Sequence, residues 1–321
     1  MPPRQKQSLR TQLLLSVVTI VLLGFAITFT VLTVQASRLQ QEQANQYAQE
    51  LARRQAAQVS ATLDEAMQSA RVVAHALGEL RASGQASRQM ANAILQGVLA
   101  GNPRLLGVWS GWEPNAFDGQ DAAFAGQTGH DQTGRFIPYW NRGSGQIGVE
   151  PLVDYDKPGN GDYYLLAKQG GREVLIEPYM YPIAGKNTLI TTVTVPIVLQ
   201  GQFVGVAGVD IALASLQEMV GKIRVFDTGR ASLVSNQGTY VGHADASKVG
   251  QAMEQGGAWD GVRQAIRAGQ ATSIETEDAD QGTVTQLYVP VQVGQASTPW
   301  AFMAQVPHDK IEAGGIGRAH V

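Results

Sequence analysis

The feature that most constrains this chain is a long uncharged segment near its N-terminus. Residues 11–37 contain no charged side chain, and from Leu13 to Val34 the sequence consists largely of Leu, Val, Ile, Phe, Thr and Gly. A helix of about 20 apolar residues crosses the hydrocarbon core of a bilayer. We therefore predict a transmembrane helix over residues 11–36, preceded by a stub of residues 1–10.

The charges that flank this segment predict its orientation. Arg4, Lys6 and Arg10 precede it without an acid, whereas charges of both signs follow it. The positive-inside rule then places the stub in the cytoplasm and everything after Ser37 outside it. The alternative is a signal peptide cleaved after Ala36, which would release a soluble secreted binding protein. The apolar run is longer than a usual signal peptide core, which favours the uncleaved anchor.

Composition excludes several classes of protein. The 321 residues include no Cys, which excludes disulfide scaffolds, thiolate zinc sites and cysteine nucleophiles. The formal net charge of −3 gives no electrostatic footprint for binding nucleic acid. The length suggests about two domains.

After the membrane segment the pattern is helical. Residues 39–80 contain no Pro, and apolar residues recur at spacings near three and four, which predicts a long amphipathic stalk helix. Its apolar stripe must pack on the following domain or on the same helix of a second chain, so we expect a homodimer through the stalk. A second helix is expected over residues 87–99, and together the two helices occupy residues 37–101. The stripe comprises Tyr47, Leu51, Val59, Leu63, Met67, Ala70, Val73, Leu77 and Leu80.

Beyond Pro103 the chain changes to short β-branched and aromatic runs separated by Gly, Pro, Asn and Asp. The clearest hairpin joins residues 191–199 to residues 203–210 across Gln200-Gly201-Gln202. A second series of strands and a helix follows Asp227. We predict an α+β chain with two modules in series, residues 102–225 and 226–312.

Aromatic and acidic residues concentrate in the first module. More than half of the Trp, Tyr and Phe residues lie between Trp109 and Tyr181, and Asp154, Asp156, Asp162 and Glu177 are interleaved with them. Carboxylates among aromatic faces are typical of a site for an organic cation. The competing interpretation is that most of these rings belong to a hydrophobic core.

Four stretches resemble the double Cache (dCache_1) sensor domain of bacterial methyl-accepting chemotaxis proteins. They are Gly161-Asp162-Tyr163-Tyr164, Glu177-Pro178-Tyr179, the hairpin from Pro196 to Asp210, and Val234 to Gly238 with His243-Ala244-Asp245. The resemblance covers about residues 35–310. It implies two PAS-like modules with antiparallel sheets, a periplasmic sensor held in the inner membrane, and a ligand site in the membrane-distal module. It also implies a chemoreceptor rather than an enzyme, with no cofactor.

The resemblance further implies where the ligand binds. The helix that begins at Asp162 covers the pocket, and Asp210 closes it. Amino-acid-binding members carry Arg-x-Trp-Tyr where this chain has Gly161-Asp162-Tyr163-Tyr164, so the Arg that grips a carboxylate is missing. An amine or other organic cation is therefore the expected ligand, and a purine is the main rival. The predicted site comprises Tyr139, Trp140, Asp162, Tyr163, Tyr164, Tyr179 and Asp210, with no catalytic residue and no metal ion.

Other motif matches carry no function. Gly143-Ser144-Gly145-Gln146-Ile147-Gly148 fits a dinucleotide fingerprint, but Pro151 follows and no helix opens there. The segment from Asp154 imitates a calcium loop but has Leu165 where the bidentate Glu should stand. The five His residues lack metal-ligand spacing. The same sensor module also precedes histidine kinases and diguanylate cyclases, so these classes stay open for the complete protein.

The C-terminal residues are expected to carry no function. Chemoreceptors of this family continue into a second span, a linker and a cytoplasmic coiled coil. Here residues 313–321 close the sequence, and Ile316 to Val321 matches a translated library adapter. We expect these six residues to be an artefact of a truncated gene fragment, with a frameshift as the alternative.

Overall fold

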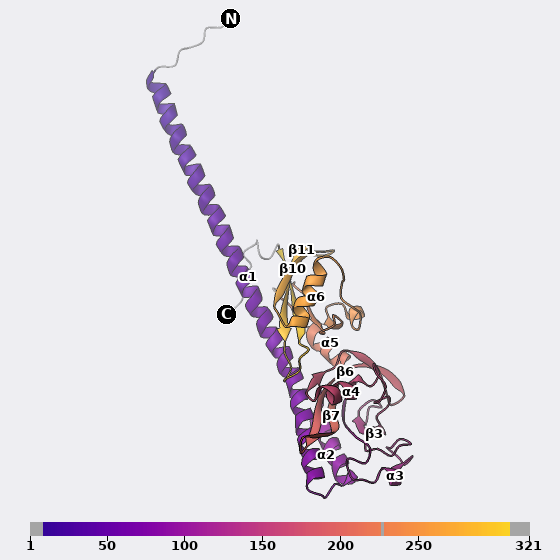
Figure 1. Ribbon diagram of the computed structural model, residues 1–321. Helices are drawn as coiled ribbons and strands as arrows, with labels where there is room; N and C mark the ends of the chain where they lie inside the picture. Colours follow the sequence, from indigo (N-terminus) through magenta and orange to yellow (C-terminus); the bar gives the residue numbers. More distant parts are fainter. Residues whose placement is uncertain (1–8, 226–227, 309–321) are drawn as a thin grey trace.

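The computed structural model describes residues 9–225 and 228–308. The predicted artefact at residues 316–321, the first residues of the predicted stub, and the junction at residues 226–227 lie outside the described residues. One helix, α1, runs without a break from Leu9 to Ala82 and extends well beyond both sheets (Figure 1). Its segment from Leu13 to Ala36 has a mean hydropathy of 2.5 and packs on nothing, so it is long and apolar enough to cross a membrane.

The part of α1 after the apolar segment packs on the rest of the chain. Leu63, Met67 and Leu77 of the predicted stripe are fully buried, whereas Tyr47 near its start is 44% exposed. The stripe contacts strands of both sheets. This helix therefore uses its apolar face for the domains that follow, the first of the two expected roles.

The sheet that lies farther from the apolar segment of α1, the distal sheet, is seven-stranded and antiparallel with the order β3-β2-β1-β7-β6-β4, in which β5 also pairs with β6 (Figure 1). Helix α2 precedes it and α3 lies in the loop after β1. Helix α4 lies between β3 and β4 in the chain and packs on β6 and β7. Ser87 caps α2 by accepting a hydrogen bond from the Met90 N–H. The bounds are α2 Arg88–Gly101, β1 Gly107–Trp112, α3 Asp121–Phe124, β2 Pro138–Asn141, β3 Gly148–Pro151, α4 Asp162–Gly170, β4 Val174–Leu175, β5 Tyr179–Ile183, β6 Lys186–Leu199 and β7 Gln202–Ala212.

The predicted hairpin is confirmed. Gln200 and Gly201 both have positive φ, 52° and 80°, as the tight two-residue turn between β6 and β7 requires. A one-residue bulge then shifts the register between Ile197 and Val198. The shift places Thr192 opposite Asp210.

The sheet that lies nearer to the apolar segment of α1, the proximal sheet, is five-stranded and antiparallel with the order β10-β11-β12-β8-β9 (Figure 1). Helix α5 leaves β7 and packs on β8 and β9, and α6 covers the opposite face. The largest hydrophobic cluster extends along α1 under both sheets, from Ala48 to Val306. The bounds are α5 Leu213–Gly221, β8 Ala231–Val234, β9 Tyr240–His243, η1 Ala246–Lys248, α6 Ala258–Ala268, β10 Thr272–Asp278, β11 Gly282–Val291 and β12 Trp300–Pro307.

The two faces of the distal sheet differ in chemistry. The face toward α1 and α2 carries mostly aliphatic residues of the shared core, with Trp112 and Trp140 among them. The face toward α4 carries a separate cluster rich in Tyr and Trp. Side chains alternate between faces along a strand, so each strand contributes every second residue to that aromatic cluster. The predicted α+β class with antiparallel sheets is confirmed.

Candidate functional site

A buried carboxylate lies at the centre of the aromatic face of the distal sheet. Asp210 on β7 is 2% exposed. Its Oδ1 accepts a hydrogen bond from Thr192 Oγ1 at 2.7 Å and another from Trp109 Nε1 at 3.1 Å. Burial raises the pKa of Asp210 to about 6 even though hydrogen bonds to the charged form lower it. This carboxyl group therefore changes charge near neutral pH.

Aromatic rings from four elements surround Asp210. Tyr163 of α4 meets Trp109 of β1 edge-on, with 5.2 Å between ring centroids. Tyr163 also stacks against Tyr179 of β5 at 6.2 Å. Tyr139 of β2 meets Tyr181 of β5 edge-on at 5.6 Å. We refer to Trp109, Tyr139, Tyr163, Tyr179 and Tyr181 as the ring cluster.

The hydroxyl groups of the ring cluster lie in the field of the carboxylate. Burial, and next the negative charge of Asp210, raise the pKa values of Tyr139 and Tyr179 well above the ordinary value. Tyr179 Oη shares a hydrogen bond of 2.8 Å with Thr192 Oγ1. The phenols are therefore neutral hydrogen-bonding groups at physiological pH.

Thr194 Oγ1 on this face is buried and has no hydrogen-bond partner among the described residues. Tyr139 Oη is also buried and makes no hydrogen bond of good geometry, but it lies close enough to Asp210 to interact with that carboxylate. Thr194 shares a face with Thr192 because it is two residues further along β6. Buried polar atoms are normally hydrogen-bonded, so the pair marks a place suited to a polar ligand or water.

Asp162, the first residue of α4, holds the loop that leads into the helix. Its Oδ1 accepts a hydrogen bond from the Gly159 N–H at 2.9 Å. No described interaction joins its carboxylate to Asp210 or to the ring cluster. The structure brings Asp162 to the edge of the predicted site rather than to its centre.

Tyr164 takes part in a second polar network beside the ring cluster. Its hydroxyl donates to Glu113 and accepts from Arg135 Nη2 at 3.3 Å. Lys168 Nζ, one turn further along α4, bonds Glu113 Oε2 at 2.8 Å. Burial would raise the pKa of Glu113, but the hydrogen bonds from Lys168 and Tyr164 bring it below its ordinary value.

Trp140 does not belong to the site, which corrects the sequence-based expectation. It follows Tyr139 in β2 and so points to the opposite face, where it packs against the core beneath α1 and α2. Its Nε1 donates to Asn92 Oδ1 of α2 at 2.8 Å. Tyr139 and Trp140 are neighbours in the sequence, but their side chains lie on opposite faces of the sheet.

Sequence reasoning left Trp109, Tyr181 and Thr192 out of the site. Tyr181 is two residues after Tyr179 in the same strand, so the alternation of a strand was a sufficient signal for it. Trp109 and Thr192 flank Asp210 on β1 and β6, and that placement depends on strand register.

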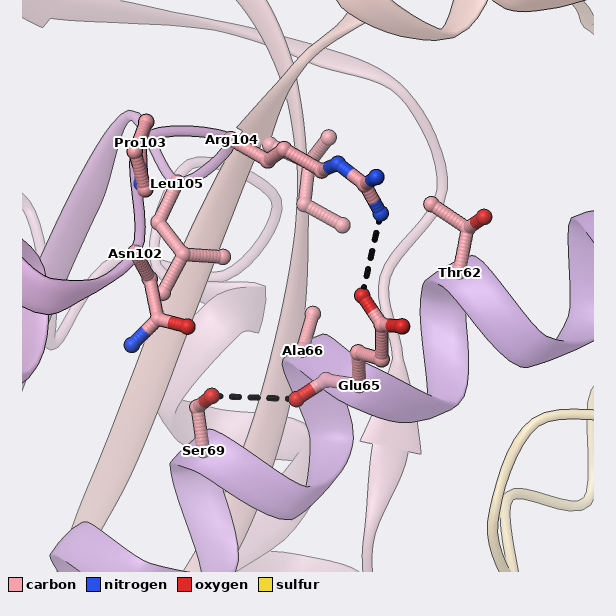
Figure 2. A pocket seen from close by; sticks show the side chains of 9 residues that line it. Thr62, Glu65, Ala66, Ser69, Asn102, Pro103, Arg104 and Leu105 are labelled. Carbon is pink, nitrogen blue, oxygen red and sulfur yellow. Dashed lines mark hydrogen bonds and ion pairs between the residues drawn. The ribbon is translucent and has the colours of Figure 1, made fainter.

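The surface hollows lie away from Asp210. One hollow of about 260 Å³ lies between α1 and the segment after α2, where Arg104 Nη1 pairs with Glu65 Oε2 at 3.1 Å (Figure 2). Another of about 370 Å³ is lined by Trp140, Asn92 and His130. Neither contains Asp210 or the ring cluster. The cluster is closely packed, so a ligand would have to part these rings to reach the carboxylate.

The described residues contain no group of three or more His, Asp or Glu side chains able to hold a metal ion. His243 and Asp245, two residues apart in the sequence motif, form a local turn in which the Asp245 N–H donates to His243 Nδ1 at 2.9 Å.

The chain is similar to known sensor proteins. The sequence profile of the Cache domain matches residues 36–314. Methyl-accepting chemotaxis protein TlpQ of Pseudomonas aeruginosa is 28% identical over 228 residues, which cover 65% of this chain and 31% of that protein. The chain thus spans less than a third of the length of this curated relative.

Two solved structures share the fold over most of the chain. The extracellular domain of the putative histidine kinase mmHK1S-Z3 superposes with a TM-score of 0.77 and 36% identity, covering 84% of this chain and 97% of that one. Methyl-accepting Chemotaxis protein X gives a TM-score of 0.71 with 25% identity, covering 82% and 97%.

Proposed function

This chain belongs to the Cache domain family, and we propose that it is the sensor part of a transmembrane chemoreceptor that binds an organic cation outside the cytoplasm. Its curated relative TlpQ is a chemotaxis protein, and the mmHK1S-Z3 domain, at 36% identity, is extracellular. In this proposal α1 anchors the sensor in the bacterial inner membrane. The membrane-distal module of residues 102–225 binds the ligand, and the module of residues 226–312 lies between it and the membrane.

The observation that carries the ligand assignment is the buried carboxylate within the ring cluster. Asp210 is 2% exposed and has no cationic side chain among its hydrogen-bond partners. A desolvated ammonium gains about 2 kcal/mol from a good aromatic contact and roughly 1.5–3 kcal/mol from a charge-assisted hydrogen bond. Since Oδ1 already accepts two hydrogen bonds, a ligand ammonium is expected to meet Oδ2. The unpartnered hydroxyl of Thr194 and the Tyr139 hydroxyl beside Asp210 supply further polar contacts.

The other proposed ligand contacts lie on or beside the same face of the distal sheet. Tyr163 and Tyr179 provide stacking surfaces beside Asp210. Tyr164 and Asp162 lie on α4 at the rim, where Asp162 can contribute a second carboxylate if its bond to Gly159 is exchanged for one to the ligand. Polyamines, histamine-like amines and quaternary ammonium compounds all have the required charge.

A purine is the rival ligand. The pKa of about 6 for Asp210 allows a protonated carboxyl that donates to a ring nitrogen, and flat rings stack on Tyr and Trp. A purine gains no charge interaction, so it would bind best where Asp210 is protonated. The pH dependence of binding separates the two ligand classes.

The complete protein can instead be a histidine kinase or diguanylate cyclase with this sensor. The likeness to the extracellular domain of the putative histidine kinase mmHK1S-Z3 supports the kinase alternative. In either case the sensor binds its ligand without catalysing a reaction, and the signal passes through α1 because this helix packs on both sheets. A homodimer through the stalk would give that signal a partner helix. The ligand shifts the equilibrium between two states only if it binds them with different affinity.

Isothermal titration calorimetry of the full chain in lipid nanodiscs tests the ligand class. The amine panel is putrescine, histamine and choline, and the purine panel is adenine and guanine. We expect at least one amine to bind, Asp210→Asn to reduce its affinity by more than tenfold, and Asp162→Asn to reduce it less. Purine binding without any amine response would contradict the cation assignment.

A further inference from the structure

Trp109 occupies a position that only a glycine on the neighbouring strand permits. Trp109 of β1 pairs with Gly208 of β7. A Cβ atom at residue 208 would lie 2.1 Å from Trp109 Cζ2 and 2.2 Å from Cε2. The indole therefore lies across the backbone of β7, where any other residue would displace it.

This placement directs the indole N–H at the carboxylate two residues further along β7. Trp109 Nε1 donates to Asp210 Oδ1 at 3.1 Å, and Thr192 Oγ1 donates to the same oxygen at 2.7 Å from the other neighbouring strand. Donors on both flanking strands fix the rotation of the carboxyl group. Neither of these two bonds involves the second oxygen, Oδ2.

We propose that Trp109 and Gly208 act together as positioning residues for Asp210, holding Oδ1 so that Oδ2 is presented to the ligand. This inference rests on the proposed function for its biological meaning, but the positioning itself is a property of the unliganded protein. Gly208 provides the space, Trp109 provides the donor, and Asp210 binds.

The ionisable groups that face Asp210 do not interfere with measuring how loss of the Trp109 donor changes the Asp210 pKa. The ionisable side chains around Asp210 are Tyr139 of β2, Tyr163 of α4, and Tyr179 and Tyr181 of β5. Burial holds all four phenols neutral well above physiological pH. A change in the titration of Asp210 after substitution of Trp109 therefore reports the loss of the indole donor.

The chain offers a matched control for the tryptophan. Trp112, in the same strand, is as buried as Trp109, but it points to the opposite face and its Nε1 has no hydrogen-bond partner among the described residues. Trp112→Phe thus removes ring volume from a core without removing a hydrogen bond. For the glycine, Gly97→Ala in α2 is a control because no atom lies within 4 Å of the added Cβ.

The test is an infrared pH titration of the carboxyl C=O band in the full chain in nanodiscs, with the band of Asp210 assigned by subtraction of Asp210→Asn. Because the lost bond stabilises the charged form, Trp109→Phe and Gly208→Ala should each raise the Asp210 midpoint by about one pH unit. Trp112→Phe and Gly97→Ala should leave it unchanged. Thr192→Val removes the other donor with little change of shape and should also raise the Asp210 midpoint. This variant provides the test if Trp109→Phe does not fold.

Calorimetry with putrescine supplies the second readout. We expect Trp109→Phe to weaken putrescine about tenfold relative to Trp112→Phe, in line with the loss of one charge-assisted bond. An Asp210 midpoint that is the same in folded Trp109→Phe and wild-type protein would overturn the positioning role. If the midpoint moves but the wild-type protein binds no amine, the positioning role stands and the proposed ligand class fails.

Discussion

Glu177 accepts a hydrogen bond from the hydroxyl of Ser235, and this bond joins the two sheets of the molecule. Glu177 lies between β4 and β5 of the distal sheet, whereas Ser235 follows β8 of the proximal sheet. The other carboxylate oxygen of Glu177 accepts from the Gln237 N–H at 3.1 Å. Two residues after Glu177, Tyr179 is part of the ring cluster around Asp210. A ligand that moves Tyr179 therefore acts on a segment that holds the proximal module directly.

We predict that Glu177→Ala weakens the contact between the sheets and lowers the free energy of unfolding by about 1–3 kcal/mol, because two hydrogen bonds to one carboxylate are lost. Glu177→Gln should cost much less, since its amide oxygen can accept either bond. Thermal unfolding of the full chain in nanodiscs measures both variants.

The pH dependence of the same variants provides the control. Burial raises the pKa of Glu177 above its ordinary value. Its contribution to stability is therefore complete below the ordinary pKa and is lost as the pH rises through the raised one. Glu177→Gln should be similar to wild type at acid pH and become more stable relative to it as the pH rises through the raised pKa. A Gln variant as unstable as the Ala variant at all pH values would mean that Glu177 acts through its charge and not through these hydrogen bonds.

A second prediction concerns the loop between β1 and β2. Arg88 of α2 is buried and pairs with Asp118 and Asp121, each at 2.8 Å, and its guanidinium carbon lies 4.0 Å from the centroid of the Phe124 ring. Arg88→Met should destabilise the protein by about 3–5 kcal/mol because it leaves two buried carboxylates without a cation. Chemical denaturation in nanodiscs measures the loss, and limited proteolysis should cut within this loop.

Arg104→Met is the matched control for Arg88. The Arg104–Glu65 pair has side chains that are 73% and 69% exposed, so its removal should change stability by less than about 1 kcal/mol. Equal effects of the two substitutions would show that burial of the Arg88 network contributes nothing to its strength.

The main elements of this fold could be predicted from the sequence because each is determined by residues close to one another in the chain. The membrane segment, the stalk stripe and the hairpin turn at Gln200-Gly201 each depend on residues that are close in the chain. The family resemblance singled out Asp210, Tyr163 and Tyr179, and the structure places the three side chains on one face of the distal sheet.

The pairing register between β6 and β7 could not be predicted from the sequence. Continuing the pairing outward from the turn at Gln200-Gly201 would place Thr191 opposite Asp210, and the bulge near Val198 moves Thr192 there instead. A bulge inserts one residue into one strand and so exchanges the faces of everything beyond it. Trp140 was misplaced for the related reason that adjacent residues in a strand point to opposite faces.

A third prediction uses the titration of Asp210. Its pKa is about 6 in the folded protein, against an ordinary value of 3.8. The folded chain therefore binds this proton more tightly than the unfolded chain, so the stability that it contributes is complete below pH 3.8 and is lost as the pH rises through about 6. Asp210→Asn keeps an acceptor for Thr192 and Trp109 but carries no charge. It should be more stable than wild type by up to about 2–3 kcal/mol at pH 8 and similar to it at pH 4.

Thermal unfolding of both proteins between pH 4 and pH 8 measures this difference. Asp162→Asn is the control, because its carboxylate bonds an exposed loop N–H rather than the buried donors. A wild-type stability that rises between pH 5 and pH 8 relative to Asp210→Asn would contradict the assignment of the raised pKa to Asp210.

The last prediction joins the same titration to ligand binding. A cation binds the charged form of Asp210, so it must displace the proton wherever the pH is below the pKa of about 6. The affinity for putrescine should therefore be nearly constant above pH 7 and fall by about tenfold per pH unit well below pH 6. Calorimetry at pH 6 in two buffers with different ionisation enthalpies should detect the released proton. In Asp210→Asn the residual affinity should be independent of pH over this range. A ligand whose binding strengthens as the pH falls through 6 would instead be one that accepts a proton from Asp210, as a neutral purine does.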